Sequence, residues 1–309
     1  MSQRVALIVN PSSGKGVGRR IGAETLTLLR DAGHDVVDVS APTYEVARRQ
    51  AERAVTDGVD TVVVVGGDGL VHLGVNLVAE RDANLAVVAA GTGNDFARNL
   101  GLPVRDPAAA VALIGSGAPR VIDAGRATGA DGEAAWFAGV RGAGFDAVVT
   151  DRAARMRWPK GQMRYNLAIL RELPVFRPIP YAIELDGRRF ETEAMLVAVA
   201  NTTSFGGGMK VCPDADVSDG LFDVLVLRGI SIPQFLRTFP KVFSGTHVTH
   251  EAVEIHRCSR VRLEAEGIRS QADGEPFAGL PLDVEVVPGA LRVWAPGATT
   301  TPTAPTAPG

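Results

Sequence analysis

Short runs of apolar, β-branched residues alternate with amphipathic segments over the first 125 residues of the chain. Runs with the length and composition of strands buried on both faces lie at residues 4–9, 34–39, 60–65 and 84–89. Amphipathic segments with helical spacing follow the first two runs and end at Gly33 and Gly58, as helices often do. This alternation predicts a parallel sheet that is covered by helices.

After about residue 130 the pattern changes to short alternating runs separated by turn signals. These runs lie at 135–140, 181–185, 189–200, 221–227, 253–256, 260–265 and 282–287. They predict an antiparallel β domain, interrupted by helical segments at 146–173 and 232–243. We expect an α/β domain at residues 1–125, to which about residues 288–296 return, a β-rich domain at 126–287 and a disordered tail at 297–309.

Composition is that of an ordinary soluble globular protein. The chain has 309 residues, of which 46% are hydrophobic, so it can form two modest cores. A formal net charge of -3 provides no global basic field and argues against nucleic acid as a partner. Two cysteines form no disulfide framework and indicate a cytoplasmic protein. No apolar run approaches the roughly 18 residues of a spanning helix, so we expect any membrane contact to be peripheral.

Glycine-rich loops follow three of the four N-terminal strands, at residues 10–18, 66–69 and 91–95. Ligands collect at the carboxyl ends of parallel strands, where loops lead into the next helix. Glycines let the backbone approach a phosphate closely, and hydroxyl groups such as that of Thr92 add donors. The loops therefore predict a polyphosphate site. Because the Asp68 carboxylate would repel phosphate, it predicts a bridging cation, Mg2+.

Each loop alone also fits a plain strand-to-helix turn. In the first loop Lys15 precedes Gly16 instead of Ser or Thr, which excludes a Walker A motif. In the second loop, however, Asp68 would be an unusual residue for packing. Three such loops at equivalent positions of one sheet favour a phosphate site over three unrelated turns.

Six segments occur in the order and approximate spacing of motifs of a known family. They are VNPSSGKG at 9–16, GGDG at 66–69, GTGNDFARNLGLP at 91–103, GFDA at 144–147, GGGMKVCPDADVSDGLFDV at 206–224 and ADGEPF at 272–277. On these motifs the chain resembles the diacylglycerol kinase family of soluble bacterial lipid kinases, relatives of sphingosine kinases and more distantly of NAD kinases and phosphofructokinases. GTGNDFAR together with the late DGE points to lipid kinases rather than NAD kinases.

The resemblance implies an NAD kinase/phosphofructokinase-like α/β domain with a parallel sheet, followed by a C-terminal antiparallel β-sandwich domain. It also implies an ATP-dependent lipid kinase that transfers the γ-phosphoryl group to the hydroxyl of diacylglycerol, giving phosphatidic acid at the inner face of the membrane. Alternative acceptors are phosphatidylglycerol and a sphingoid base. The alternative outside the enzymes is a pseudokinase that binds lipid or nucleotide. A homodimer is compatible with the resemblance, although no residue argues for one.

Residue roles also follow from the resemblance. The family's general base matches Asp273, and the residues that organise Mg2+ and its water network match Asp68 and Asp123. A second, structural Mg2+ matches the side chains of Asp216 and Asp219 and the carbonyl of Leu221. The nucleotide loops match Asn10, Ser13, Gly67, Asp68, Gly69, Thr92 and Asn94.

The chemistry of these residues alone leaves alternatives open. A carboxylate within reach of a lipid hydroxyl can take its proton, but Asp273 followed by glycine also fits a hairpin turn. Asp123 also fits an ordinary strand end. The oxygen-rich spacing of residues 214–220 suits a hard cation and equally an Asx-turn loop without metal.

Two features concern nucleotide and membrane contact. The family usually follows GGDG with Thr and, two residues on, an Asn-Glu pair, whereas residues 70–73 here are Leu, Val, His and Leu. Activity is expected to survive because Asp68, Asp123 and Asp273 remain.

Residues 152–164 mix basic side chains with methionine and tryptophan. This composition is typical of a segment that lies on an anionic membrane, and it also fits a solvated helical face.

Overall fold

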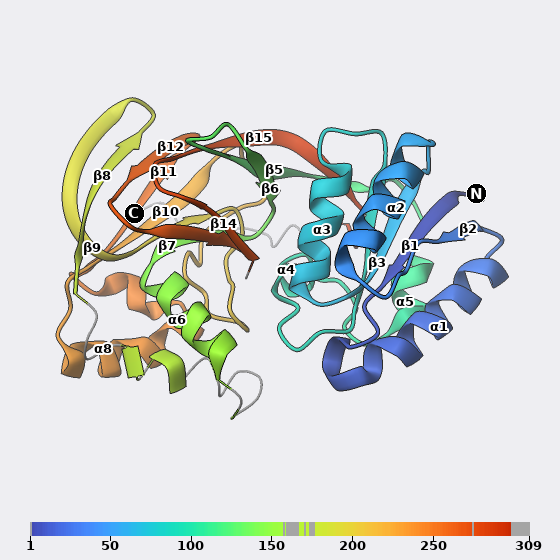
Figure 1. The fold of residues 1–309 in the computed structure, drawn as a ribbon, viewed down its shortest axis with the longest axis horizontal. Helices are drawn as coiled ribbons and strands as arrows, with labels where there is room; N and C mark the ends of the chain where they lie inside the picture. Colours follow the sequence, from blue (N-terminus) through green and yellow to red (C-terminus); the bar gives the residue numbers. More distant parts are fainter. Residues whose placement is uncertain are drawn as a thin grey trace, which may run out of the picture.

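The computed structural model describes residues 2–156, 158, 167–169, 171–172, 177–273 and 275–297. An α/β domain and a β domain lie side by side and are joined by long strands (Figure 1). All but the first residue of the tail predicted at 297–309, and the middle of the predicted helix at 146–173, lie outside the described residues.

The α/β domain is built on four parallel strands in the order β4-β3-β1-β2. Its elements are β1 (Arg4–Val9), α1 (Val17–Asp31), β2 (Asp35–Asp38), α2 (Tyr44–Thr56), β3 (Thr61–Gly66), α3 (Asp68–Val78), β4 (Asn84–Ala89), α4 (Asp95–Asn99) and α5 (Pro107–Ala112). The predicted parallel sheet is therefore confirmed.

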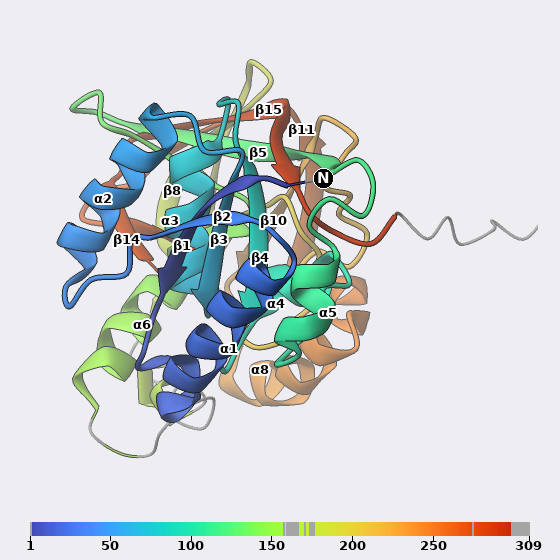
Figure 2. The same ribbon diagram turned by 90° about the vertical axis from the view of Figure 1, so that its right-hand side faces the viewer.

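Alternate residues of each central strand point to opposite faces of this sheet and fill two cores. Val62 and Val64 pack toward α2 and α3, whereas Val63 and Val65 pack toward α1 and α5. Figure 2 shows the helices on both faces. This double burial explains the unbroken apolar runs in the sequence.

The β domain consists mainly of antiparallel strands, as predicted. Its strands are β5 (Arg120–Gly129), β6 (Ala134–Phe137), β7 (Val140–Gly144), β8 (Ile179–Leu185), β9 (Arg188–Ala200), β10 (Phe222–Arg228), β11 (Val253–Cys258), β12 (Arg260–Glu264), β13 (Arg269–Ala272), β14 (Glu275–Gly279) and β15 (Leu282–Val293). The single strand expected at 135–140 is wrong, because β6 pairs with β5 while β7 pairs with β9 and β13.

Helical segments cover one end of the β domain (Figure 1). They are α6 (Phe145–Arg155), α8 (Ile232–Thr238) and a 3-10 turn at Phe239–Phe243. Phe145 and Phe235 make an edge-to-face contact with ring centroids 6.1 Å apart, which packs α6 against α8. The helix expected at 232–243 thus has a 3-10 second half that begins next to Pro240.

Strand β15 joins the two domains. It pairs antiparallel with β12 and β5 and reaches β4, beside which it runs parallel. Trp294, directly after the strand, is buried and donates from its indole nitrogen to the Thr61 hydroxyl at 3.0 Å. The C-terminal end of β15 therefore completes the core of the α/β domain.

Candidate active site

The three glycine-rich loops meet at one edge of the parallel sheet. An ideal Cβ atom on Gly91 would lie 2.5 Å from the Gly67 Cα, and one on Gly14 would lie 2.3 Å from the Ala90 carbonyl oxygen. Side chains at these positions would force the loops apart. The glycines thus bring the loop backbones to the close approach that a phosphate-binding surface needs.

The predicted nucleotide residues differ in exposure and contacts. Asn10 accepts from the backbone N–H and the hydroxyl of Ser12, and Ser13 is buried. Asn94 has a positive φ of 56° and closes its own loop, because its side chain accepts from the Gly91 N–H at 2.9 Å and donates to the Gly91 carbonyl at 3.0 Å. Thr92 is exposed. Asn94 therefore shapes the third loop, while Thr92 is open to a ligand.

Asp68 begins α3 and lies among other carboxylates. Burial, the charge of Asp95 and to a smaller extent the charge of Asp273 raise the pKa of Asp68 to about 6, although it accepts from the Phe96 N–H at 3.4 Å. Gly93 leaves room for this side chain, since an ideal Cβ there would lie 2.6 Å from Asp68 Oδ2. Negative charge is thus concentrated where the glycine-rich loops end.

This charge fits a divalent cation that arrives with a nucleotide. Within the described residues no group of three or more His, Cys, Asp or Glu side chains is arranged to hold a metal ion by itself. Mg2+ commonly takes one or two carboxylates and completes its shell with substrate phosphates and water. Asp68 could therefore serve as one carboxylate ligand of such a cation.

Asp273 lies in the turn between β13 and β14 and reaches toward α3. Its φ of 52° is in the left-handed region, which aspartate tolerates better than most residues. Oδ1 accepts from the Val140 N–H at 3.2 Å, and Oδ2 lies 3.4 Å from His72 Nδ1. Gly139 leaves the space for Oδ1, because an ideal Cβ there would lie 2.2 Å from that oxygen. The hairpin-turn and base interpretations of Asp273 are thus compatible.

A polar stripe on α3, formed by Asp68, His72 and Asn76, recurs every four residues. Such spacing places side chains on the same face of a helix. Asn76 donates to the Trp136 carbonyl and accepts from the Trp136 N–H, both at 2.9 Å. The stripe therefore runs from the phosphate loops along the boundary with the β domain.

Arg141 places a buried positive charge behind Asp273. It pairs with Ala272 in the ladder between β7 and β13, and only 1% of the residue is exposed. Its guanidinium carbon lies 5.0 Å from the ring centroid of Phe137 and 4.8 Å from that of Phe277. Burial lowers the pKa of Arg141 to about 10, and the charge of Asp273 partly opposes this shift. Aromatic faces and a nearby carboxylate thus stabilise a cation in the core.

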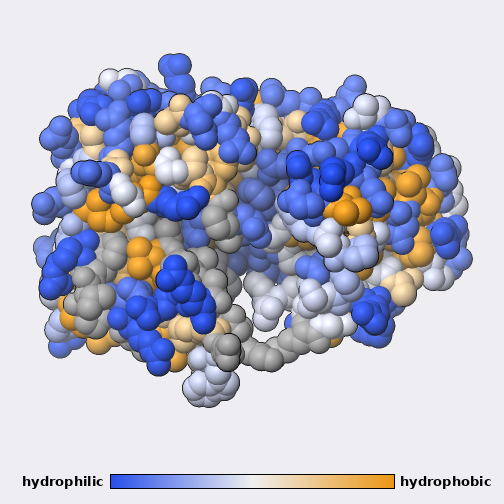
Figure 3. All heavy atoms as spheres, in the orientation of Figure 1, coloured by the Kyte–Doolittle hydropathy of each residue, from blue (hydrophilic) through white to orange (hydrophobic). Residues whose placement is uncertain are grey.

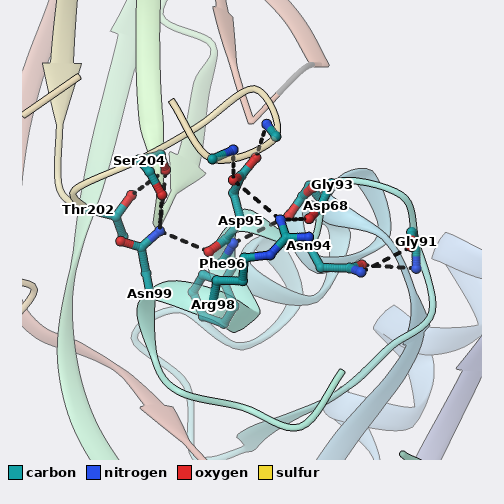
Figure 4. A network of polar contacts seen from close by, with 12 residues as sticks. Asp68, Gly91, Gly93, Asn94, Asp95, Phe96, Arg98, Asn99, Thr202 and Ser204 are labelled. Carbon is teal, nitrogen blue, oxygen red and sulfur yellow. Dashed lines mark hydrogen bonds and ion pairs between the residues drawn. The ribbon is translucent and has the colours of Figure 1, made fainter. Parts of the chain in front are cut away.

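Helix α4 connects the third loop to the β domain (Figure 4). The carboxylate of Asp95 accepts from the backbone N–H groups of Gly207 and Gly208 at 2.6 and 2.7 Å. One turn later, Asn99 accepts from the Thr203 N–H at 3.0 Å and donates to the Ser204 hydroxyl at 3.1 Å. The GTGNDFARN motif therefore shapes the third glycine-rich loop and contributes contacts to the interface between the domains.

Asp123 is buried on β5, and both oxygens of its carboxylate are engaged. Oδ1 accepts from the Gly289 N–H and Oδ2 from the Gly220 N–H, each at 2.8 Å. Asn201 donates to the Asp123 carbonyl at 3.0 Å. In this arrangement the carboxylate links β5, β15 and the loop before β10. None of these contacts joins it to Asp68 or Asp273.

The predicted structural metal residues lie in the loop before β10. Asp216 accepts from the N–H and hydroxyl of Ser218 at 3.0 and 2.7 Å, as in an Asx turn. Asp219 accepts from the Leu221 N–H at 3.0 Å and forms an ion pair with Arg257. A cation would have to compete with that guanidinium. The geometry therefore favours the Asx-turn alternative, and a metal at Asp216, Asp219 and Leu221 stays a prediction.

Burial explains the departure from the family at residues 70–73. Leu70, Val71 and Leu73 pack into the core of the α/β domain, whereas His72 faces Asp273. Opposite the start of α3, the Glu275 carboxylate approaches Gly69, where an ideal Cβ would lie 2.6 Å from Oε1. The last glycine of GGDG thus accommodates the glutamate of the DGE motif.

Several of these polar contacts were not predicted from the sequence. His72 was noted without a role, and Asp95, Asn99 and Asn76 were not singled out. The four-residue spacings in the segments that follow two of the glycine-rich loops would have indicated polar helix faces.

Comparisons with known proteins identify the family of the chain. Residues 4–127 match a family profile described as the diacylglycerol kinase catalytic domain, and residues 139–295 match one described as the YegS C-terminal NAD kinase beta sandwich-like domain. A Mycobacterium tuberculosis protein named diacylglycerol kinase is 40% identical over 294 residues, covering 95% of each chain. One of the same name from Bacillus subtilis is 31% identical and covers 90% of this chain and 92% of its own.

Solved structures show the same fold. A Bacillus anthracis protein with 24% sequence identity superposes with a TM-score of 0.77 over 96% of this chain and 99% of its own. A second, named a diacylglycerol kinase from the same organism, has 22% identity and a TM-score of 0.71 over 96% and 98%. With the two matching profiles and the curated relatives, these comparisons show that the chain belongs to the diacylglycerol kinase family of lipid kinases.

Proposed function

We propose that the protein transfers the γ-phosphoryl group of ATP to the hydroxyl group of diacylglycerol and releases phosphatidic acid and ADP. The observation that carries this proposal is the approach of Asp273, from the β domain, to the phosphate loops. Its charge contributes to the raised pKa of Asp68, and its Oδ2 lies 3.4 Å from His72 on the helix that Asp68 begins. A carboxylate at the end of a phosphate site suits a general base for phosphoryl transfer.

ATP would lie with its phosphates on the three loops and at the N-terminal end of α3. Backbone N–H groups and the hydroxyl of Thr92 would contact the phosphates. Asp68 would hold Mg2+, which neutralises charge on the β- and γ-phosphates when it is bound. The surface is hollowed between the two domains (Figure 3), and the loops and the β13–β14 turn approach each other across this boundary.

In the chemical step, the lipid hydroxyl oxygen would bond to the γ-phosphorus while the bond from that phosphorus to the bridging β–γ oxygen breaks. The hydroxyl proton would pass to Asp273, and ADP would leave. Asp95 and Asn99 would hold the domains in register, because they join the third loop to residues 203–208. Positioning of this kind is most of what a phosphoryl-transfer enzyme supplies.

An apolar cavity supports a lipid acceptor. It has a volume of about 100 Å3 and lies between the strands of the β domain and its helices. Its lining includes Phe145, Leu225, Phe235, Phe239 and His247. Burial lowers the pKa of His247, which suits a neutral ring beside apolar side chains. An apolar cavity of ~150 Å3 can bind benzene, so this smaller cavity of about 100 Å3 suits only the last few carbon atoms of an acyl chain.

The outer face of the same helices supports access from a membrane. Ile232, Leu236 and Phe243 are 41%, 48% and 40% exposed, although neighbouring residues of these helices line the cavity. Trp158, after α6, is 77% exposed. Large exposed apolar side chains on cavity-lining helices suit contact with a lipid surface. Among the described residues, no helix is long and apolar enough to span a membrane, and we propose peripheral association with the inner face of the membrane.

The test is phosphate transfer from radiolabelled ATP by the purified full-length chain with Mg2+. Diacylglycerol in mixed micelles is compared with phosphatidylglycerol, sphingosine and NAD. Asp273→Asn is assayed beside Asp283→Asn, a matched control on the surface of β15. Formation of phosphatidic acid that is lost in the first variant and kept in the control supports the proposal.

Other outcomes separate the alternatives. Transfer to another lipid keeps the mechanism and changes the acceptor. Binding of ATP without transfer to any acceptor contradicts the kinase proposal and supports the pseudokinase alternative. Full activity of Asp273→Asn contradicts the assignment of the base.

A further inference from the structure

We propose that His72 positions the carboxylate of Asp273 for proton transfer, so that one contact aligns the nucleotide-binding helix with the general base. The inference rests on the proposed function, in which Asp273 accepts the proton of the lipid hydroxyl. His72 Nδ1 lies 3.4 Å from Asp273 Oδ2, and both side chains are 14% exposed. The contact joins residues that are 201 positions apart in the chain.

The β domain fixes the rest of Asp273. The Asp273 N–H donates to the Val140 carbonyl and Oδ1 accepts from the Val140 N–H, both at 3.2 Å. With Oδ1 held on β7, the group facing Oδ2 determines how the carboxylate is rotated. A carboxylate held at both oxygens directs its remaining lone pairs in a defined direction. Proton transfer requires this alignment with the bound hydroxyl.

His72 is fixed by its own helix. One turn later, Asn76 donates to the His72 carbonyl and to the Trp136 carbonyl, each at 2.9 Å. These contacts attach α3 to β6, so the imidazole stays near Asp273 as long as the domains remain in register. Three carboxylates lie near it: Asp273, Asp68 one turn earlier on α3, and Glu275, which approaches the start of the helix. The positive charge of Arg141 lies on the far side of Asp273. An N–H donor at Nδ1 complements this negative surface.

The substitution of His for the family's usual Asn at position 72 provides matched variants. In both residues the nitrogen that can donate is bonded to Cγ, so His72→Asn keeps a donor close to the position of Nδ1. His72→Gln moves the donor one methylene group further from the backbone. His72→Leu removes it and keeps a side chain of intermediate size. A purely space-filling role would rank these variants by volume, whereas a positioning role ranks them by donor position.

The experiment measures kcat and the KM for ATP of these full-length proteins with diacylglycerol micelles. We expect kcat to fall about 10- to 100-fold in His72→Leu and His72→Gln, because a misplacement of about 1 Å can cost 10²-fold. His72→Asn should keep kcat within about threefold of the wild type. The KM and Kd for ATP should be unchanged in all three, since His72 has no described contact with the phosphate loops.

A double-variant comparison tests whether His72 acts through Asp273. His72→Leu should have little further effect on the residual turnover of Asp273→Asn, which radiolabelled ATP makes measurable. Equal loss of kcat in both backgrounds, a kcat of His72→Asn as low as that of His72→Leu, or a raised KM for ATP with unchanged kcat would each overturn the proposal. A wild-type protein that phosphorylates no lipid refutes the proposed function itself, whereas an active wild type with insensitive His72 variants refutes this inference alone.

Discussion

The ionised carboxylate of Asp68 should destabilise the folded protein, and its substitution should reveal by how much. Burial and the charges of Asp95 and Asp273 raise the pKa of Asp68 from 3.8 to about 6. Each pKa unit corresponds to about 1.4 kcal/mol, so the cost at neutral pH is about 3 kcal/mol. Asp68→Asn removes the charge and keeps an oxygen that can accept from the Phe96 N–H. It should raise the free energy of unfolding by about 3 kcal/mol at neutral pH.

The increase in the free energy of unfolding that Asp68→Asn produces should depend on pH. Between pH 3.8 and about 6, the folded protein binds more protons at Asp68 than the unfolded chain does. The free energy of unfolding of the wild type therefore loses this contribution as the pH rises through that window, and the cost is constant above it. The two proteins should have similar stabilities near the lower end of the window and differ fully at neutral pH.

Urea unfolding without Mg2+ or nucleotide, repeated across this pH range, measures the effect. Asp31→Asn, at the exposed end of α1, is the control for loss of a surface carboxylate and should change stability by less than about 0.5 kcal/mol. Equal stability of Asp68→Asn and wild type at neutral pH, or an increase that is the same at both ends of the range, would refute the reasoning.

Three further outcomes follow from the structure. Asp95→Ala leaves two glycine N–H groups without their acceptor and should lower the free energy of unfolding by about 3 kcal/mol in thermal or urea unfolding; unchanged stability would show that the interface does not depend on them. Gly93→Ala places a methyl group 2.6 Å from Asp68 Oδ2. It should reduce kcat about tenfold or more with little change in melting temperature. A normal kcat would contradict the expected displacement of Asp68. Leu236→Glu should weaken sedimentation with anionic vesicles about tenfold, while turnover of a short-chain, water-soluble diacylglycerol stays normal; equal sedimentation of both proteins would contradict a membrane-facing α8.

The parallel part of the fold could be predicted because its signals are local. β3 is buried on both faces, ends at Gly66 and is followed at once by Gly67 and Asp68, so one short segment indicates a central strand and a ligand loop together. The break between β6 and β7 had no such signal. Ala138 and Gly139, between Phe137 and Val140, include no polar turn residue. Which strand each flank pairs with is decided by β5 and β9 elsewhere in the chain.

In the candidate site, too, local motifs could be predicted and long-range contacts could not. Asp68 and Asp273 could be found from their motifs, but their mutual approach depends on how two domains meet. Asp95 contacts glycines more than a hundred residues away. The carboxylate of Asp123 joins β15 to the loop before β10, and no local pattern in the sequence indicates that these two segments are close. Contacts of this kind follow from tertiary packing and are absent from residue spacing.

The path of β15 has a consequence for synthesis of the protein on the ribosome. The edge of β4 is paired by residues near position 293, so most of the chain must be translated before this sheet is complete. Until then a nascent α/β domain exposes an unpaired strand edge and lacks Trp294 in its core. Chains interrupted before residue 282 should therefore be targets for chaperones and proteases even though they contain all three glycine-rich loops.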